Sequence, residues 1–249
     1  MRTLVGITLL TFVALPAVRA AAQTETETVN RTVPFPNNGT LHLKNVLGEI
    51  TITGTSGHDI VMKATRRATR DRLDHITLTV NTSGSTVTIN ANNREDGWTD
   101  HDNNVVETTF EIQVPSSARL NVDAFSSRLN IAGVGGPQHL KTFSGDITVR
   151  DAKDAVDADA FNGALDIDAS AAGADPDLRL KTFSGHIRVR LAEHARGTVH
   201  FDTFSGGFDS DFPIAMHSMR KRNVTADLPG GAGHALNIST FSGDLTIRK

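Results

Sequence analysis

The chain has 249 residues, of which 38% are hydrophobic and 21% are charged. It contains no cysteine, which excludes disulfides, zinc–thiolate sites, iron–sulfur clusters and cysteine nucleophiles. With 25 basic and 28 acidic residues, it also lacks the excess of basic residues with which nucleic-acid-binding proteins neutralise phosphates. We therefore expect one large domain or two small ones, with no nucleic acid as partner.

Residues 1–22 have the pattern of a secretory signal peptide. Arg2 precedes an apolar run from Leu4 to Val18, and small residues up to Ala22 then fit a signal-peptidase site. The run is short for a membrane span, and no later segment reaches the length required. The alternative is an uncleaved membrane anchor. We expect an exported protein, periplasmic or extracellular, whose mature chain has no transmembrane segment.

The remaining chain divides by the regularity of its pattern. Residues 23–38 are expected to be a flexible lead-in, residues 39–115 a set of irregular β coils, and residues 116–249 the regular repeat section of the same domain. The one helix candidate is the stretch 64–74, where threonines and a high density of charge weaken the pattern. The sequence thus predicts an all-β protein.

A Thr-Phe-Ser-Gly tetrad recurs through the second half of the chain. It begins at Thr142, Thr182, Thr203 and Thr240, with degenerate copies at Ala124 and Ala160. Its phenylalanines are Phe125, Phe143, Phe161, Phe183, Phe204 and Phe241. Alternating β-branched residues follow most copies, and periods near 20 residues made of strands are typical of a β-solenoid, in which each repeat is one coil. A β-sandwich is the alternative, but its strands rarely share one motif.

The direction of the phenylalanines depends on whether the strand is continuous through the tetrad. Phe143, Ile147 and Val149 have the same parity, so a continuous strand places them on one face. We therefore expect a buried structural ladder of stacked phenylalanines beside ladders of isoleucine and valine. Alternatively, a bend at Gly145 reverses the phase and exposes the rings as a flat platform for sugars.

These repeats resemble a known family, the bacterial putative-adhesin proteins built from β-strand repeats, a domain family of unknown function. The resemblance covers roughly residues 35–249 and is carried by Leu47-Gly48-Glu49-Ile50, the stretch 76–90, Val114-Pro115, Ala118-Arg119-Leu120, the repeated tetrad unit and the stretch 230–247. It implies a β-helix-like domain that is exported or membrane-attached, with a role in adhesion. It implies no catalytic residue.

Two pairs of aspartates are the candidates for a metal site. Asp157 and Asp159, and likewise Asp166 and Asp168, are two residues apart, so each pair lies on one face of a strand. Clustered carboxylates on an exported protein could hold calcium. The alternative is a solvated face that keeps a stacked sheet soluble.

The loop 93–104 is the candidate for local ligand binding. It contains the only tryptophan, Trp98, together with Asp100, His101 and Asp102. An aromatic ring beside acids is a common arrangement for binding sugars, and loops on rigid scaffolds often carry function. A polar hairpin insertion has the same composition.

No catalytic motif emerges from the sequence, so we expect a protein that is not an enzyme and needs no cofactor. The predicted function is an adhesion or envelope-associated binding or structural module, with a polysaccharide or surface component as partner. A β-helix polysaccharide lyase or hydrolase is the alternative, by analogy of fold. The last strand, Asp244 to Arg248, is expected to leave an open edge that permits end-to-end self-association.

Overall fold

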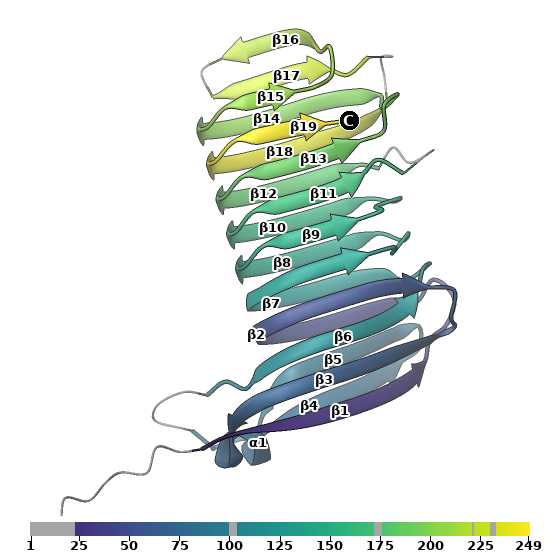
Figure 1. Cartoon of the computed structure of the whole chain (residues 1–249), viewed down its shortest axis with the longest axis vertical. Coiled ribbons are helices and arrows are strands. Elements are labelled where there is room, and N and C mark those ends of the chain that lie inside the picture. Colours follow the sequence, from purple (N-terminus) through teal and green to yellow (C-terminus); the bar gives the residue numbers. More distant parts are fainter. Residues whose placement is uncertain (1–22, 100–103, 172–175, 221, 230–232) are drawn as a thin grey trace, which may run out of the picture.

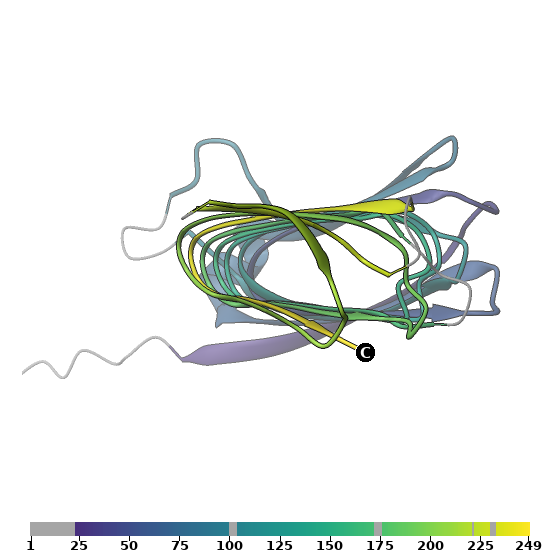
Figure 2. The same cartoon turned by 90° about the horizontal axis from the view of Figure 1, so that it is seen from above.

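The computed structural model describes residues 23–99, 104–171, 176–220, 222–229 and 233–249. These residues form an elongated stack of flattened coils, in which two β layers lie back to back around a narrow interior (Figures 1 and 2). In the regular section, each coil consists of a strand on one face, a tight corner, and a strand on the other face. The β-solenoid class predicted from the repeat is confirmed.

Nineteen strands and one short helix make up the described chain. In chain order they are β1 (Thr24–Pro34), β2 (Thr40–Thr55), β3 (Asp59–Thr69), α1 (Arg70–His75), β4 (Ile76–Ser83), β5 (Thr86–Arg94), β6 (Glu107–Pro115), β7 (Arg119–Ala132), β8 (Gln138–Ser144), β9 (Ile147–Arg150), β10 (Val156–Asn162), β11 (Leu165–Ala169), β12 (Leu178–Ser184), β13 (Ile187–Leu191), β14 (Gly197–Ser205), β15 (Phe208–Ser210), β16 (Ala215–Arg220), β17 (Asn223–Asp227), β18 (His234–Ser242) and β19 (Leu245–Arg248).

The two layers are parallel sheets in register. Face A contains β8, β10, β12, β18 and β14 in spatial order, and face B contains β9, β11, β13, β19 and β15. The long strands β2 and β7 run through the corner, pair with each other along both faces, and join the faces into one hydrogen-bonded network. Towards the N-terminus, face A continues into β5 and β4, and face B into β6, β3 and β1.

The core lies between the two faces and is filled from both. Alternate residues of each strand point inward, as in Leu140 on face A and Ile147 and Val149 on face B, none of which has exposed surface. Because consecutive coils repeat this alternation in register, the inward side chains form continuous apolar columns.

The predicted burial of the six tetrad phenylalanines is wrong, because the strand phase reverses at the corner. Thr142 points inward, Phe143 points outward, and Ile147 points inward again on the other face. The residues that face the interior therefore change parity where the chain passes from face A to face B. All six of these phenylalanines are 42–55% exposed, whereas the aromatic side chains buried in the core are those of Phe35, Phe110, Phe201 and Phe212.

Glycine is required at the corner by the close approach of neighbouring coils. A Cβ atom on Gly163 would lie 2.0 Å from the carbonyl oxygen of Gly145, and one on Gly185 would lie 2.0 Å from that of Gly163. The inward Thr182 hydroxyl donates a hydrogen bond to the Gly163 carbonyl at 3.1 Å. The Thr-Phe-Ser-Gly repeat therefore encodes a corner with a buried hydroxyl, an outward ring and a backbone contact without room for a side chain.

Two expectations for the N-terminal half also need correction. The predicted flexible lead-in is wrong for residues 24–34, which form β1, because this segment pairs with β3 along its whole length. The doubtful helix at 64–74 is a strand over its first half and the helix α1 from Arg70. Across the described ranges, no helix has the length and apolarity needed to cross a membrane.

The C-terminal coil is not the end of the stack. Strand β18 lies between β12 and β14, and β19 lies between β13 and β15, so the last coil in the chain is inserted between two earlier ones (Figure 1). On face A, the antiparallel strands β17 and β16 then cover β14. The expectation of an open edge at Asp244 to Arg248 is wrong, since both sides of β19 are paired.

Candidate functional site

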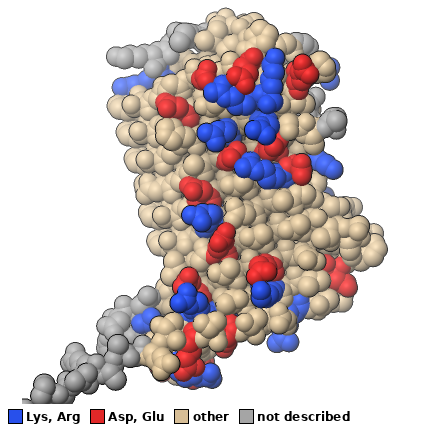
Figure 3. Space-filling model, in the orientation of Figure 1, with Lys and Arg blue, Asp and Glu red and all other residues tan. Residues whose placement is uncertain are grey.

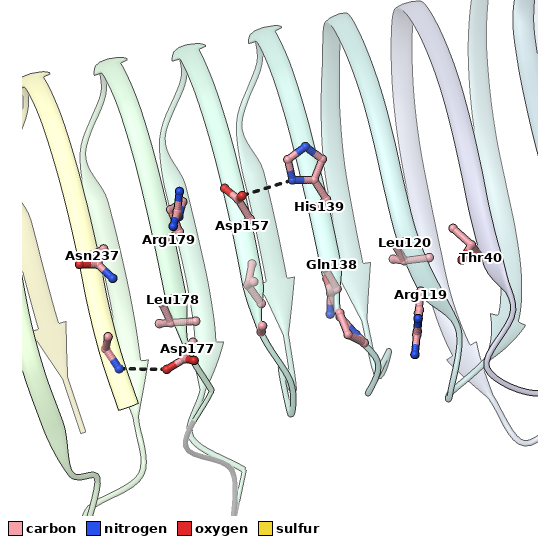
Figure 4. A pocket seen from close by; sticks show the side chains of 14 residues that line it. Thr40, Arg119, Leu120, Gln138, His139, Asp157, Asp177, Leu178, Arg179 and Asn237 are labelled. Carbon is pink, nitrogen blue, oxygen red and sulfur yellow. Dashed lines mark hydrogen bonds and ion pairs between the residues drawn. The ribbon is translucent and has the colours of Figure 1, made fainter. Parts of the chain in front are cut away.

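A groove of about 460 Å³ crosses face A at the beginnings of its strands. It extends from Thr40 on β2 across β7, β8, β10 and β12 to β18, on the side of face A away from the corner (Figure 4). With strands about 4.8 Å apart, these six strands span about 24 Å. One register position on successive coils forms the floor of the groove. It holds the short side chains of Pro137, Ala155 and Ala235, and the longer side chains of Arg119 and Asp177 in the same column rise beside them.

A row of polar side chains lines the groove at the spacing of the coils. His139, Asp157, Arg179 and Asn237 occupy the same register position on β8, β10, β12 and β18. His139 Nδ1 lies 3.4 Å from a carboxylate oxygen of Asp157 (Figure 4). The side chains are thus distributed along a line rather than gathered around one point.

The acids of the groove have partners, whereas its arginines are available. Asp177 lies 3.3 Å from His234 Nδ1 and accepts a hydrogen bond from the backbone N–H of Ala235 at 3.0 Å. Neither Arg119 nor Arg179 forms an ion pair or side-chain hydrogen bond with another described residue. Two guanidinium groups, three strands apart, therefore present unused donors to whatever enters the groove.

Face B differs, because three of its arginines, Arg150, Arg190 and Arg248, are paired with aspartates. Arg150 donates a hydrogen bond to Asp166 at 2.9 Å, and this contact lowers the pKa of the Asp166 carboxyl. Arg248 donates to Asp209 and Asp211, each at 2.8 Å. Figure 3 shows acidic and basic side chains interleaved on one face of the molecule rather than separated into patches of one sign.

One buried polar residue lies beneath the groove. Gln138 stands in the inward column between Leu120 and Val156, and is 3% exposed. Its amide nitrogen donates to the Val134 carbonyl at 3.0 Å, but its Oε1 has no partner among the described residues. Burial of an acceptor without a hydrogen bond lowers the stability of the fold. Gln138 therefore adds a polar group to the wall of the groove, in addition to the polar side chains along its rim.

The second distinctive surface is the aromatic corner, which we call the Phe ridge. In spatial order it consists of Phe125, Phe143, Phe161, Phe183, Phe241 and Phe204. Neighbouring ring centroids are 4.7–5.0 Å apart and the ring planes differ by only 3–4°. The guanidinium of Arg222 covers the last ring, Phe204, at 3.9 Å from its centroid. Because each inner ring is stacked on both sides, the ridge presents ring edges to solvent.

The four aspartates considered for calcium lie on opposite faces. Asp157 and Asp159 are on β10 of face A, and Asp166 and Asp168 are on β11 of face B. Asp168 lies 3.7 Å from Arg190, Asp166 lies 2.9 Å from Arg150, and Asp157 lies 3.4 Å from His139. Within the described part of the chain, no three acidic or histidine side chains converge as a metal site would require. Calcium binding by these aspartates stays a prediction. A bound calcium ion would have to compete with their existing ion pairs.

The predicted ligand loop is only partly described. Trp98 stacks on His75 with ring centroids 5.1 Å apart and planes 4° apart, and it packs against a small cluster of Ala68, Leu73, Ile76 and Val106. One face of its ring is therefore occupied within the fold. Asp100, His101 and Asp102 lie outside the described residues.

Sequence reasoning missed the groove, because its residues come from six strands and share no motif. The available signal was the column of small residues before the strands, at Pro137 and Ala155, beside the polar row at His139 and Asp157. This column can be recognised only when the register between successive coils is known, and the repeat period gives that register only approximately.

Comparisons with known proteins find related chains. A family model described as Toastrack DUF4097 matches residues 119–248. Among solved structures, a putative cell adhesion protein from Clostridium sporogenes is similar, with 11% identity over 91% of this chain and 99% of that chain and a TM-score of 0.48. A putative adhesin from Bacteroides fragilis has 8% identity over 89% of this chain and 97% of that chain, with a TM-score of 0.39. No curated protein matches the chain at a significant level.

Proposed function

Because the chain belongs to the Toastrack DUF4097 family, as its repeats predicted, we propose a function that this fold serves through its outer surface. The protein is an exported, non-catalytic binding module, and its ligand is an acidic polysaccharide of the cell envelope or its surroundings. The groove on face A is the binding site. The single observation that carries this proposal is a straight polar groove across six coils with two unpaired arginines in it.

The shape of the groove favours a polymer over a compact ligand. Small-molecule sites are concave and surround their ligand, whereas this groove runs along a flat face for about 24 Å. Its side chains recur from coil to coil, so a chain with its own repeat can make similar contacts at successive positions. Planar donors and acceptors such as Asp157 and Asn237 suit hydroxyl groups.

The charge of the groove favours an acidic polymer over a neutral one. Arg119 and Arg179 can each hold a carboxylate or sulfate in a bidentate manner, and neither loses an existing partner by doing so. Asp157 and Asp177 each lie beside a histidine, at 3.4 Å from His139 and 3.3 Å from His234. Binding of this kind weakens as salt concentration rises.

The Phe ridge is less suited to sugars than the groove. Sugar rings stack on the faces of aromatic rings, and in the ridge those faces are already occupied by neighbouring phenylalanines. The exposed corner therefore does not supply the flat platform that an exposed row of rings would otherwise offer.

The test is retention of the chain by acidic and neutral insoluble polysaccharides and by envelope fractions, with calcium and with a chelator. The variant Arg119→Ala with Arg179→Ala is compared with Arg188→Ala with Arg190→Ala, which removes two arginines from face B. We expect retention by acidic polymers, reduced at least tenfold in the groove variant and unchanged in the face B variant.

Reducing sugar ends are measured in the same tubes. Equal retention of both variants would exclude the groove as the site, and retention by neutral polymers alone would exclude the role of the arginines. Release of sugar ends would instead support the β-helix lyase or hydrolase. Retention that requires calcium would support a calcium site at Asp157 and Asp159, which lie on the same face as the groove.

A further inference from the structure

We propose that the Phe ridge is a self-association surface on which a second copy of this chain docks, ridge to ridge, with the two stacks antiparallel. The Phe ridge is separate from the groove, because the groove lies where the strands of face A begin and the ridge lies at the corner where they end. The ridge is exposed to solvent: six stacked rings, each 42–55% exposed, form one continuous apolar strip. Soluble proteins rarely leave such a strip without a partner.

The area of the ridge is close to what a stable dimer needs. Six half-exposed phenylalanines present on the order of 600 Å². A standard interface buries about 800 Å² on each partner. The apolar strip also continues onto β2, where Val46 stands in register with Phe125, and Leu47 beside it is 37% exposed. The ridge and its immediate flanks therefore reach the size of a specific interface.

The period of the ridge also matches a second copy. Its ring edges recur every 4.7–5.0 Å, which is the spacing of the coils themselves. A surface without this period would meet the rings at only some positions, whereas an identical ridge can meet them at every coil where the two ridges overlap. An interface in which the same patch serves both partners has two-fold symmetry.

A row of alternating charge selects the antiparallel arrangement. Two residues before each ridge position, the strands of face A carry, in spatial order, Lys44, Asp123, Lys141, Asp159, Lys181, Ser239 and Asp202. The sign of the charge alternates over the first five of these positions. In an antiparallel pair, face A of one copy adjoins face A of the other, and the two charged rows run side by side in opposite directions.

The charges also fix the register. With the two-fold axis between Phe143 and Phe161, Asp123 of each copy faces Lys181 of the other, and Lys141 faces Asp159. Both facing pairs of charged residues are then of opposite sign, and Lys44 faces the uncharged Ser239. This match favours association and disfavours a shift by one coil. A parallel pair would instead place face A against face B and lose this match.

Single cysteines test the geometry, because the chain has none of its own. Ser144→Cys lies beside the inferred axis, Ser205→Cys lies at the far end of the ridge, and Thr246→Cys lies on face B. Under mild oxidation we expect a disulfide-linked dimer from Ser144→Cys, at least tenfold more than from the other two variants. Equal cross-linking at Ser144 and Ser205 would overturn the antiparallel arrangement, and none above the Thr246 level would overturn the interface.

Sedimentation of the full chain tests the association without any cross-link. We expect a concentration-dependent dimer that is lost in Phe161→Lys with Phe183→Lys and kept in Thr148→Lys with Thr246→Lys on face B. Circular dichroism shows whether each variant is folded. All variants begin at the same residue, so they differ only at the substituted positions. A wild-type chain that stays monomeric at the highest concentration reached, or a ridge variant that still dimerises, would contradict the proposal.

Discussion

Phenylalanine occupies two environments in this molecule, and they differ in energy. Phe201 is 1% exposed and fills the core of one coil, whereas Phe143 is 45% exposed and is stacked between Phe125 and Phe161. A buried ring contributes its full transfer from water and leaves a cavity when it is removed. A ring on the ridge contributes stacking and partial burial only.

The first prediction compares these two rings. Phe201→Ala should lower the free energy of unfolding by about 3–5 kcal/mol, the range for a buried aromatic side chain. Phe143→Ala should lower it by about 1–2 kcal/mol, because half of its surface is already in water and only the stacking is lost. Urea denaturation followed by circular dichroism measures both, and equal losses would mean that Phe143 is in the core.

A second prediction concerns the hydrogen bond between Arg150 and Asp166. It lowers the pKa of Asp166, so the carboxylate stabilises the fold above its unfolded pKa, near 4, and this contribution disappears as the pH falls through the folded value. Asp166→Asn should therefore reduce stability at neutral pH and have little effect in strong acid. Arg150→Gln should give the same pH dependence, and the double variant should add little. Equal losses at both pH values would show that the pair acts through packing.

At the scale of the element, the unit of this protein is a strand, a corner and a second strand. Gly163 and Gly185 allow the corners of successive coils to touch, and the inward Thr182 satisfies a carbonyl there. Parallel pairing in register then aligns every column of side chains, including the groove, the Phe ridge and the charged row. The surfaces of the molecule are thus a direct consequence of one repeated corner.

The inserted C-terminal coil gives the third prediction. Removal of residues 234–249 takes away β18 and β19, which separate β12 and β13 from β14 and β15. Amide hydrogen exchange should show loss of protection in β14 and β17, because their support is gone, while β2, β7 and β8 keep theirs. Unchanged protection of β14 would mean that it can dock directly on β12.

The sequence was sufficient for the period, the all-β class, the family and most strand positions, because each depends on local patterns. It was insufficient for the side on which Phe143 lies, since the two-residue period applies only within one strand and the chain changes sheets at Gly145. The inserted position of β18 depends on long-range pairing that no local pattern records. The groove depends on register between coils, so Pro137 and Ala155 carry no signal on their own.

At the scale of the whole molecule, the fold is an elongated stack with different surfaces around its circumference. The interior columns supply stability, the groove on face A supplies polar contacts over about 24 Å, and the Phe ridge supplies an apolar strip at the corner. In the proposed dimer the two grooves lie on the same side of the pair, since the two copies of face A adjoin. Such a pair would bind a polymer at two sites and gain avidity from the arrangement.

The most direct test of this account is hydroxyl-radical footprinting of the full chain, with and without the acidic polysaccharide that retains it best. The account predicts oxidation of Phe161 and Phe183 at concentrations that keep the chain monomeric, protection of Phe110 and Phe201 throughout, and protection of His139 only when the polymer is present. Polymer-dependent protection of the Phe ridge with no change at His139 would contradict it, and would place the binding site at the corner.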